Sequence, residues 1–146
     1  MTDTNLHQLY FNCQLANKSQ AVELIGELGA QLTGVAGKPE IIKLLNEREA
    51  VGSTMIADHV LLPHIESASL KESRIIYLHL ERPIPFWSET DKDIRLIIVI
   101  LLKHNETMAI KKQISLAVRK LADEAFVETL INMETEGAFK KALMNV

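Results

Sequence analysis

The sequence predicts a single α/β domain, residues 1–146, in which helices flank a mixed β-sheet on both sides. Its best strand candidate is Ile94 to Leu102, a run that is almost continuously apolar and rich in β-branched residues. Such a run is typical of a central strand that is covered on both faces. Apolar residues at helical spacing occur both before and after the strand candidates. The chain contains no low-complexity linker and no internal repeat, and its length suits one domain with a real core.

The first part of the chain is expected to hold a short strand, Tyr10 to Leu15, followed by a helix. Asn17 or Ser19 can cap this helix, and Gly34 and Gly37 end it. Its apolar positions recur at helical spacing: Val22, Ile25, Leu28 and Leu32.

A second helix is expected to open at Lys38–Pro39, because proline suits a first helical turn. It ends among charged residues around Arg48, and Gly52-Ser53-Thr54 then breaks it. Met55 to Leu62 follows as an apolar strand with a turn inside it at Asp58 and His59. Pro63 fixes the backbone φ and lacks an N–H, so regular pairing is expected to end there.

The next expected strand is Arg74 to Leu80, apolar on most of both faces and ended by Arg82-Pro83-Ile84-Pro85. Beyond the central strand the pattern becomes helical up to Leu121. Asp123 is placed to cap a shorter helix, and Thr135 to open the last one. The apolar face of the first of these three helices is Ile110, Ile114, Ala117 and Leu121.

Bulk composition excludes several classes of protein. The formal net charge is −3, which argues against direct nucleic-acid binding. The single cysteine, Cys13, excludes a disulfide within the chain and is expected to be a buried, inert thiol. The N-terminus lacks the features of a signal peptide, and the run IRLIIVILL is too short to span a membrane. A cytoplasmic protein is therefore expected.

Common catalytic and cofactor motifs are missing from the sequence. The five histidines show no zinc-enzyme spacing and no partnering cluster, so no metal is expected. There is no P-loop, no GxGxxG turn and no glycine-flanked serine of a hydrolase elbow. We therefore expect no bound cofactor.

Arg48 and His64 remain as the candidates for chemistry. Arginine binds phosphate through a planar, bidentate fork, and an imidazole held at the end of a buried element is a usable nucleophile near neutral pH. Gly52-Ser53-Thr54 offers backbone N–H groups and hydroxyls that can hold a phosphate. Each feature also has a plainer interpretation: a helix-end charge, a histidine that closes a strand, and an ordinary turn.

At these residues the sequence resembles a known family. REAVGST, followed by a short strand and LPH, is similar to the signature of the fructose/mannitol-type enzyme IIA domains of the bacterial phosphoenolpyruvate-dependent sugar phosphotransferase system. The segments PIPFWSETDKDIRLIIVILL and LADEAFVETLINMETEGAFKKAL also fall where this family has comparable segments. The resemblance covers nearly the whole chain and implies a mixed sheet with helices on both sides.

The resemblance also implies a chemistry. His64 would accept a phosphoryl group from the phosphohistidine of the carrier protein HPr and pass it to an enzyme IIB. Arg48 would stabilise the phosphate charge, while Ser53 and Thr54 would shape or contact the site. The membrane would be involved only indirectly, through the sugar permease, and no cofactor would be needed.

The sequence departs from the family pattern at three places. Ile65 and Leu61 stand where small residues are usual, after the active histidine and two positions before the proline. Many members carry a second histidine at the start of the helix after the central strand, where this chain has Ala109-Ile110-Lys111-Lys112. Either Lys111 replaces that contact, His104 serves from the preceding loop, or the contact is missing.

Three functions remain open at this point. The chain is a sugar-transport phosphocarrier, a regulatory module of the same fold (nitrogen-type or from a transcriptional regulator) that is switched by phosphorylation of His64, or a binding domain that has lost phosphorylation. In the first two cases a transient partner interface is expected around His64, with an apolar rim that includes Ile65. This sequence does not determine which sugar is transported, because in the family that it resembles the sugar binds the membrane component.

Overall fold

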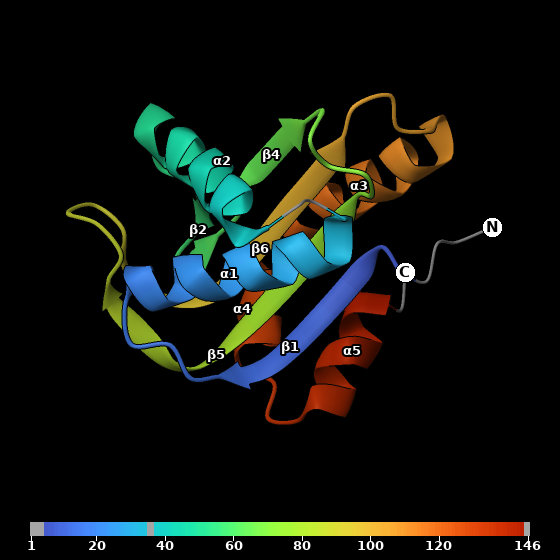
Figure 1. Ribbon diagram of the computed structural model, residues 1–146. Coiled ribbons are helices and arrows are strands. Elements are labelled where there is room, and N and C mark those ends of the chain that lie inside the picture. The colour runs from blue at the N-terminus through green and yellow to red at the C-terminus, as the bar shows by residue number, and fades with distance from the viewer. Residues whose placement is uncertain (1–4, 35–36, 145–146) are drawn as a thin grey trace.

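The computed structural model describes residues 5–34 and 37–144, and the statements below concern these residues. A mixed, six-stranded sheet forms the centre of the molecule, with helices on both of its faces (Figure 1). The predicted fold class is therefore confirmed. The elements in chain order are β1 His7–Cys13, α1 Lys18–Thr33, α2 Lys38–Val51, β2 Met55–Ala57, β3 Val60–Leu61, β4 His64–Ser67, β5 Arg74–Phe86, β6 Lys92–Lys103, α3 Met108–Leu121, α4 Glu124–Ile131 and α5 Glu136–Met144.

The sheet has the strand order β1-β5-β6-β3-β2, with β4 as a second partner of β6 beside β3. β1 runs parallel to β5, β5 antiparallel to β6, and both β3 and β4 run parallel to β6. β6 is the predicted central strand, and its residues Leu96 to Leu101 are each at most 1% exposed. This complete burial explains why its sequence shows no alternation of polar and apolar residues.

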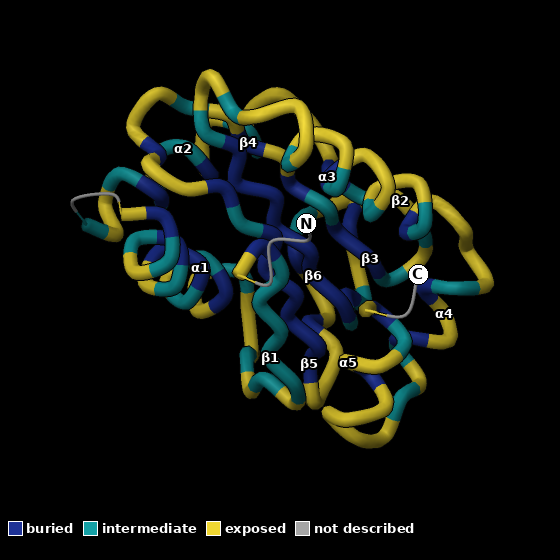
Figure 2. The backbone as a smooth tube through the Cα atoms, turned by 90° about the vertical axis from the view of Figure 1, so that its right-hand side faces the viewer, coloured by how far each residue is buried: buried dark blue, intermediate teal, exposed yellow. Residues whose placement is uncertain are grey.

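Each face of the sheet has its own apolar core. On one face the side chains of Ile97, Val99 and Leu101 pack beneath α1 and α2. On the other face Leu96, Ile98 and Ile100 pack beneath α3, α4 and α5. Figure 2 shows the two helical layers on opposite sides of the buried strands. No helix among the described residues is long and apolar enough to cross a membrane.

Most of the predicted helix boundaries are confirmed by their caps. The Asn17 side chain accepts a hydrogen bond from the Gln20 N–H at 2.9 Å and so begins α1. Gly34 ends α1 in the left-handed conformation (φ 73°), whereas Gly37 does not end it but precedes α2. Asp123 caps α4, and the Thr135 hydroxyl accepts from the Ala138 N–H at the start of α5.

Two strand predictions were wrong in their limits. The first strand is His7–Cys13 rather than Tyr10 to Leu15. β5 does not end at Arg82–Pro85 but continues to Phe86, with a register shift between His79 and Ile84. Its pairing with β1 stops at Leu80, so both prolines lie where one edge of β5 is unpaired. A proline without an N–H is tolerated at such an edge.

The prediction that pairing ends at Pro63 was also wrong. Pairing with β6 is interrupted after Leu61 and resumes at once, with His64 opposite Ile100. The Pro63 carbonyl accepts a hydrogen bond from the Ile100 N–H at 2.9 Å, so the proline interrupts the ladder without moving the chain away from β6. His64 therefore begins a strand instead of following one. The turn predicted at Asp58 and His59 is confirmed, and it separates β2 from β3.

Candidate functional site

His64 is the first residue of β4, and its side chain is exposed. Neighbouring residues of a parallel pair point to the same side of the sheet, and Ile100 belongs to the core beneath α3, α4 and α5. His64 therefore projects toward the α3 side. Its backbone is held by β6, while neither ring nitrogen has a hydrogen-bond partner within residues 5–34 and 37–144. The backbone position of His64 is therefore fixed, while its imidazole ring is exposed.

The other histidines differ from His64 in their surroundings. His79 is buried, stacks on Phe11 with ring centroids 4.2 Å apart, and bonds the Ile131 carbonyl. Burial lowers the pKa of His79. His7 bonds the Tyr77 hydroxyl, and His59 lies 3.0 Å from the Asp93 carboxylate. Only His64 and His104 are classed as exposed along the described chain.

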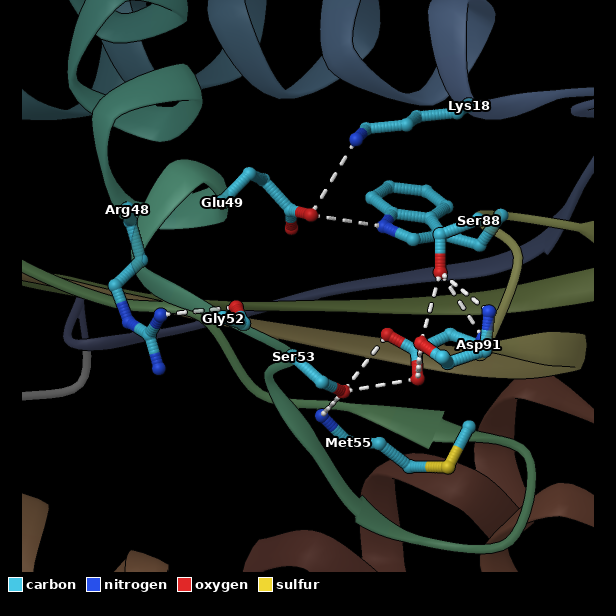
Figure 3. Close-up of polar contacts among 10 residues, drawn as sticks. Lys18, Arg48, Glu49, Gly52, Ser53, Met55, Ser88 and Asp91 are labelled. Carbon is cyan, nitrogen blue, oxygen red and sulfur yellow. Dashed lines mark hydrogen bonds and ion pairs between the residues drawn. The ribbon is translucent and has the colours of Figure 1, made fainter.

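Arg48 lies in the last turn of α2, and its guanidinium is directed to the turn that follows. Its Nη1 donates to the Gly52 carbonyl at 3.2 Å (Figure 3). Gly52 ends the helix at φ 154°, where a residue with a Cβ is strained. The glycine of the GST motif is thus required by the backbone, and its carbonyl anchors the arginine.

A backbone hydrogen bond connects this turn to the segment just before the strand that carries the histidine. The Thr54 carbonyl accepts from the Leu62 N–H at 2.8 Å, two residues before His64. The Thr54 side chain is 4% exposed, and its hydroxyl has no hydrogen-bond partner in the described part of the chain. A buried hydroxyl without a partner is uncommon and points to a missing contact.

Ser53 has a different role from Thr54. Its hydroxyl lies 2.7 and 2.9 Å from the two carboxylate oxygens of Asp91 and accepts from the Met55 N–H at 3.1 Å. The hydroxyl proton is therefore given to Asp91, and of the two functions that the resemblance implies, shaping the site is the one that this geometry favours. Sequence reasoning missed Asp91, because the run from Ser88 to Asp93 reads only as a turn.

The two candidates for the family's second histidine lie in different surroundings. Lys111 is exposed in the first turns of α3, where its ammonium has no hydrogen bond or ion pair among the described residues. The His104 Nε2 lies 3.8 Å from a carboxylate oxygen of Glu66. Glu66 alternates with buried Ile65 and so shares a side of β4 with His64. His104 is thereby connected to the histidine strand.

The departures at Leu61 and Ile65 are explained by packing. Both side chains are buried, at 0% and 5% exposure, in the core beneath α1 and α2. They point away from the side of the sheet on which His64 lies. The expectation that Ile65 forms part of an apolar rim was therefore wrong. Val51, which is 81% exposed at the end of α2, is a large apolar side chain directly before the turn.

Two further observations concern possible metal ligands and a groove near the turn. No three His, Cys, Asp or Glu side chains in residues 5–34 and 37–144 are placed to hold a metal ion. The groove beside Ser53 and Asp91, about 570 Å³ in volume, is lined by residues of β2 and α4 and includes neither Arg48 nor His64.

Cys13 is only half-buried, in contrast to the expected full burial, and this partial burial raises the pKa of its thiol.

The mixed sheet with its two helical layers is the fold of the α/β enzyme IIA domains. The family model described as "Phosphoenolpyruvate-dependent sugar phosphotransferase system, EIIA 2" matches residues 4–146. The chain therefore belongs to this family, whose domains act as phosphotransfer components.

Relatives of two kinds are similar to the chain. A nitrogen regulatory protein of Klebsiella oxytoca is 28% identical over 121 residues, which are 82% of this chain and 72% of the relative. The multiphosphoryl transfer protein 1 of Escherichia coli K12 is 31% identical over 127 residues, which are 86% of this chain and 15% of that protein.

Solved structures share the fold. The nitrogen regulatory protein IIA-Ntr of Neisseria meningitidis superposes with a TM-score of 0.78 at 20% identity, covering 95% of this chain and 97% of the other. The mannitol enzyme IIA of Escherichia coli, in a complex with phosphorylated mannitol enzyme IIB, gives a TM-score of 0.71 at 19% identity, with coverage of 100% and 99%.

Proposed function

We propose that this domain is a phosphocarrier in which His64 accepts a phosphoryl group from phospho-HPr and passes it to an enzyme IIB during sugar uptake. The observation that carries the proposal is an exposed imidazole whose backbone is fixed by pairing with Ile100. A hydrogen bond two residues earlier links it to the turn whose Gly52 carbonyl accepts from Arg48. A neutral imidazole in such a place is a nucleophile near neutral pH.

In the transfer step a lone pair on one ring nitrogen of His64 attacks the phosphorus of the donor phosphohistidine. A new N–P bond forms as the N–P bond to the donor breaks, and its electron pair returns to the donor ring. No oxidant, metal or cofactor takes part in this exchange. Catalysis then depends on positioning and on stabilising the charge of the three phosphoryl oxygens.

Four side chains have proposed roles around this phosphoryl group, three as donors and one indirectly. Arg48 uses Nη1 for the Gly52 carbonyl, which leaves its other guanidinium donors for phosphoryl oxygens. The unpartnered Thr54 hydroxyl is a second donor, and the Lys111 ammonium a third, from α3. Ser53 acts indirectly, by holding the turn.

The proposal is tested by incubation with phosphoenolpyruvate, enzyme I and HPr, followed by intact mass measurement. We expect wild type to gain one acid-labile phosphoryl group and His64→Ala to gain none. A wild-type chain that stays unmodified by an HPr that phosphorylates another enzyme IIA would overturn the proposal and favour a binding domain.

A regulatory module switched by His64 phosphorylation is the second candidate. It is favoured by the nitrogen regulatory protein of Klebsiella oxytoca, which aligns with 82% of this chain. Phosphorylation of an exposed histidine adds charge and acceptor oxygens at the surface, which can make or break a protein interface. The chemistry at His64 is the same for both candidate functions. They are distinguished by whether an enzyme IIB accepts the phosphoryl group.

The acceptor is identified by a chase of the phosphorylated domain with purified enzyme IIB of the mannitol or fructose type. Complete transfer within seconds would support the sugar-transport function. A phosphoryl group that persists in the presence of these acceptors would favour the regulatory function. Donor-free domain mixed with unphosphorylated enzyme IIB serves as the control.

A further inference from the structure

We infer that the β5–β6 loop, residues 87–91, positions Arg48 and the Gly52–Thr54 turn for phosphoryl transfer, with Asp91 as its principal positioning residue. The inference rests on the proposed function, because it assigns the loop a role in that same site. Neither Asp91 nor Trp87 is placed to act on the phosphoryl group directly; each acts through a residue of the turn or of α2.

Asp91 is a buried carboxylate, 5% exposed, whose hydrogen bonds converge on the turn. Both of its oxygens accept from the Ser53 hydroxyl, at 2.7 and 2.9 Å (Figure 3). The Thr90 hydroxyl donates to the same carboxylate at 3.3 Å. Burial of an ionised carboxylate is costly unless it is hydrogen-bonded, so these contacts are expected to hold Ser53 firmly.

The loop is closed by its own hydrogen bonds, which fix the position of Asp91. The Trp87 and Ser88 N–H groups donate to the Asp91 carbonyl at 3.0 and 3.1 Å. The Asp91 N–H donates in turn to the Ser88 hydroxyl at 3.0 Å. The Asp91 carboxylate therefore lies in a hairpin loop whose own hydrogen bonds fix its position between β5 and β6.

A second contact of the same loop reaches α2. The indole N–H of Trp87 donates to a carboxylate oxygen of Glu49 at 3.2 Å, and the Trp87 side chain is 4% exposed. Lys18 of α1 lies 3.4 Å from the same oxygen and 5.6 Å from the indole centroid. Glu49 directly follows Arg48, so this contact fixes the helix end that carries the arginine.

The two contacts thus hold the chain on both sides of Gly52, one of them at the residue that follows Arg48. Glu49 is held by Trp87 and Ser53 by Asp91, while Gly52, between them, receives the Arg48 guanidinium. A positioning role follows, because small displacements of a charged group reduce transfer rates strongly. Positioning by Asp91 predicts that Asp91→Asn slows transfer, whereas simple electrostatics predicts that removal of the charge helps an anionic phosphoryl group to bind.

The test compares single-turnover transfer from phospho-HPr in wild type, Asp91→Asn, Ser53→Ala and the double variant. We expect each single change to lower the maximal rate about tenfold, with the half-saturating HPr concentration unchanged. The double variant should be no slower than the slower single variant, because both changes act on the same Ser53–Asp91 contact: Ser53→Ala removes the donor, and Asp91→Asn removes the charge and one of the two acceptor oxygens. If the fold losses of the two single variants multiply in the double variant, or if Asp91→Asn transfers faster than wild type, the inference is overturned.

Amide hydrogen exchange tests the same claim without a phosphoryl donor. In Asp91→Asn the Met55 and Leu62 amides, which bond Ser53 Oγ and the Thr54 carbonyl, should exchange at least about tenfold faster. Amides in the paired core of β5 and β6 should be unchanged, which separates loss of the turn from general destabilisation. Unchanged exchange at Met55 and Leu62 would overturn the inference.

Glu89→Gln is the matched control, since it neutralises an exposed carboxylate two residues earlier in the same loop. It should leave both the transfer rate and the exchange pattern as in wild type. If wild type accepts no phosphoryl group, the proposed function fails and the positioning role fails with it. If wild type is phosphorylated but Asp91→Asn transfers at the wild-type rate, the inference fails alone.

Discussion

At the scale of single residues, the two hydroxyls of the turn are distinguished by their partners. Ser53 gives its proton to Asp91, whereas the buried Thr54 hydroxyl has no partner in the described chain. Burial of a hydroxyl without a hydrogen bond costs about 1–3 kcal/mol. If His64 carries a phosphoryl group, as proposed, Thr54 is therefore the hydroxyl that gains most from one of its oxygens.

Thr54→Val tests this assignment. The substitution replaces the unpartnered hydroxyl by a methyl group of similar shape, so we expect the free energy of unfolding to rise by about 1 kcal/mol. Transfer from phospho-HPr should fall about tenfold. Urea denaturation and single-turnover kinetics give the two values, and a loss of stability would contradict an unpartnered hydroxyl.

Arg48→Lys tests the need for a guanidinium. Lysine keeps the charge but lacks the planar fork whose separate nitrogens can bond the Gly52 carbonyl and the phosphoryl oxygens from fixed positions, so we expect transfer to fall about 100-fold. Melting temperature should change little, because the side chain is half-buried at a helix end. Arg82→Lys, on an exposed part of β5, is the control; equal transfer in both variants would refute the role of Arg48.

At the scale of elements, the site depends on how α2 ends. Gly52 takes φ 154° and allows the chain to turn from α2 into β2, and a Cβ there would meet no atom within 4 Å. Any penalty for a side chain at this position is therefore conformational. The same turn brings the Thr54 carbonyl to Leu62 and so fixes the approach to β4.

Gly52→Ala should consequently destabilise the fold by about 1–3 kcal/mol, as measured by chemical denaturation. Gly137→Ala is the matched control, because Gly137 lies in α5 and a Cβ there also meets nothing within 4 Å. Alanine in a helix should stabilise by about 0.4–1 kcal/mol. Equal effects of the two substitutions would argue against strain at Gly52.

At the scale of the whole molecule, the buried His79 makes stability depend on pH. Burial lowers its pKa from the ordinary value of 6.5, so the unfolded chain binds a proton more readily than the folded chain. The contribution of His79 to the free energy of unfolding is fully present above pH 6.5 and is lost as the pH falls toward the pKa of the folded state. Urea midpoints between pH 7.5 and 5.5 should therefore decrease, and the decrease should be smaller in His79→Gln. Equal decreases would exclude His79 as the cause.

The helical layers and the central strand of this fold were predicted from the sequence more accurately than the ends of its strands. The burial of Ile94 to Leu102 and the helix caps at Asn17 and Asp123 follow from local patterns. The resumption of pairing at His64 does not, since it depends on the Ile100 N–H reaching the Pro63 carbonyl across the sheet. The extension of β5 likewise depends on which of its edges is unpaired.

The candidate site shows the same division. Arg48, the GST turn and His64 lie close together in sequence and form a motif, so the sequence alone could single them out as candidates. Asp91 lies 38 residues after Ser53, and no local pattern connects the two. The burial of Ile65 required knowledge of which side of β4 faces the core.

The most direct test of the account is nitrogen NMR of the histidine rings, recorded before and after incubation with phosphoenolpyruvate, enzyme I and HPr. We predict that one ring nitrogen of His64 couples to phosphorus and shifts, and that the same change occurs in His104→Gln. Phosphorylation of His104 or of any other histidine, with the His64 signals unchanged, would contradict the assignment of His64 as the phosphoryl acceptor.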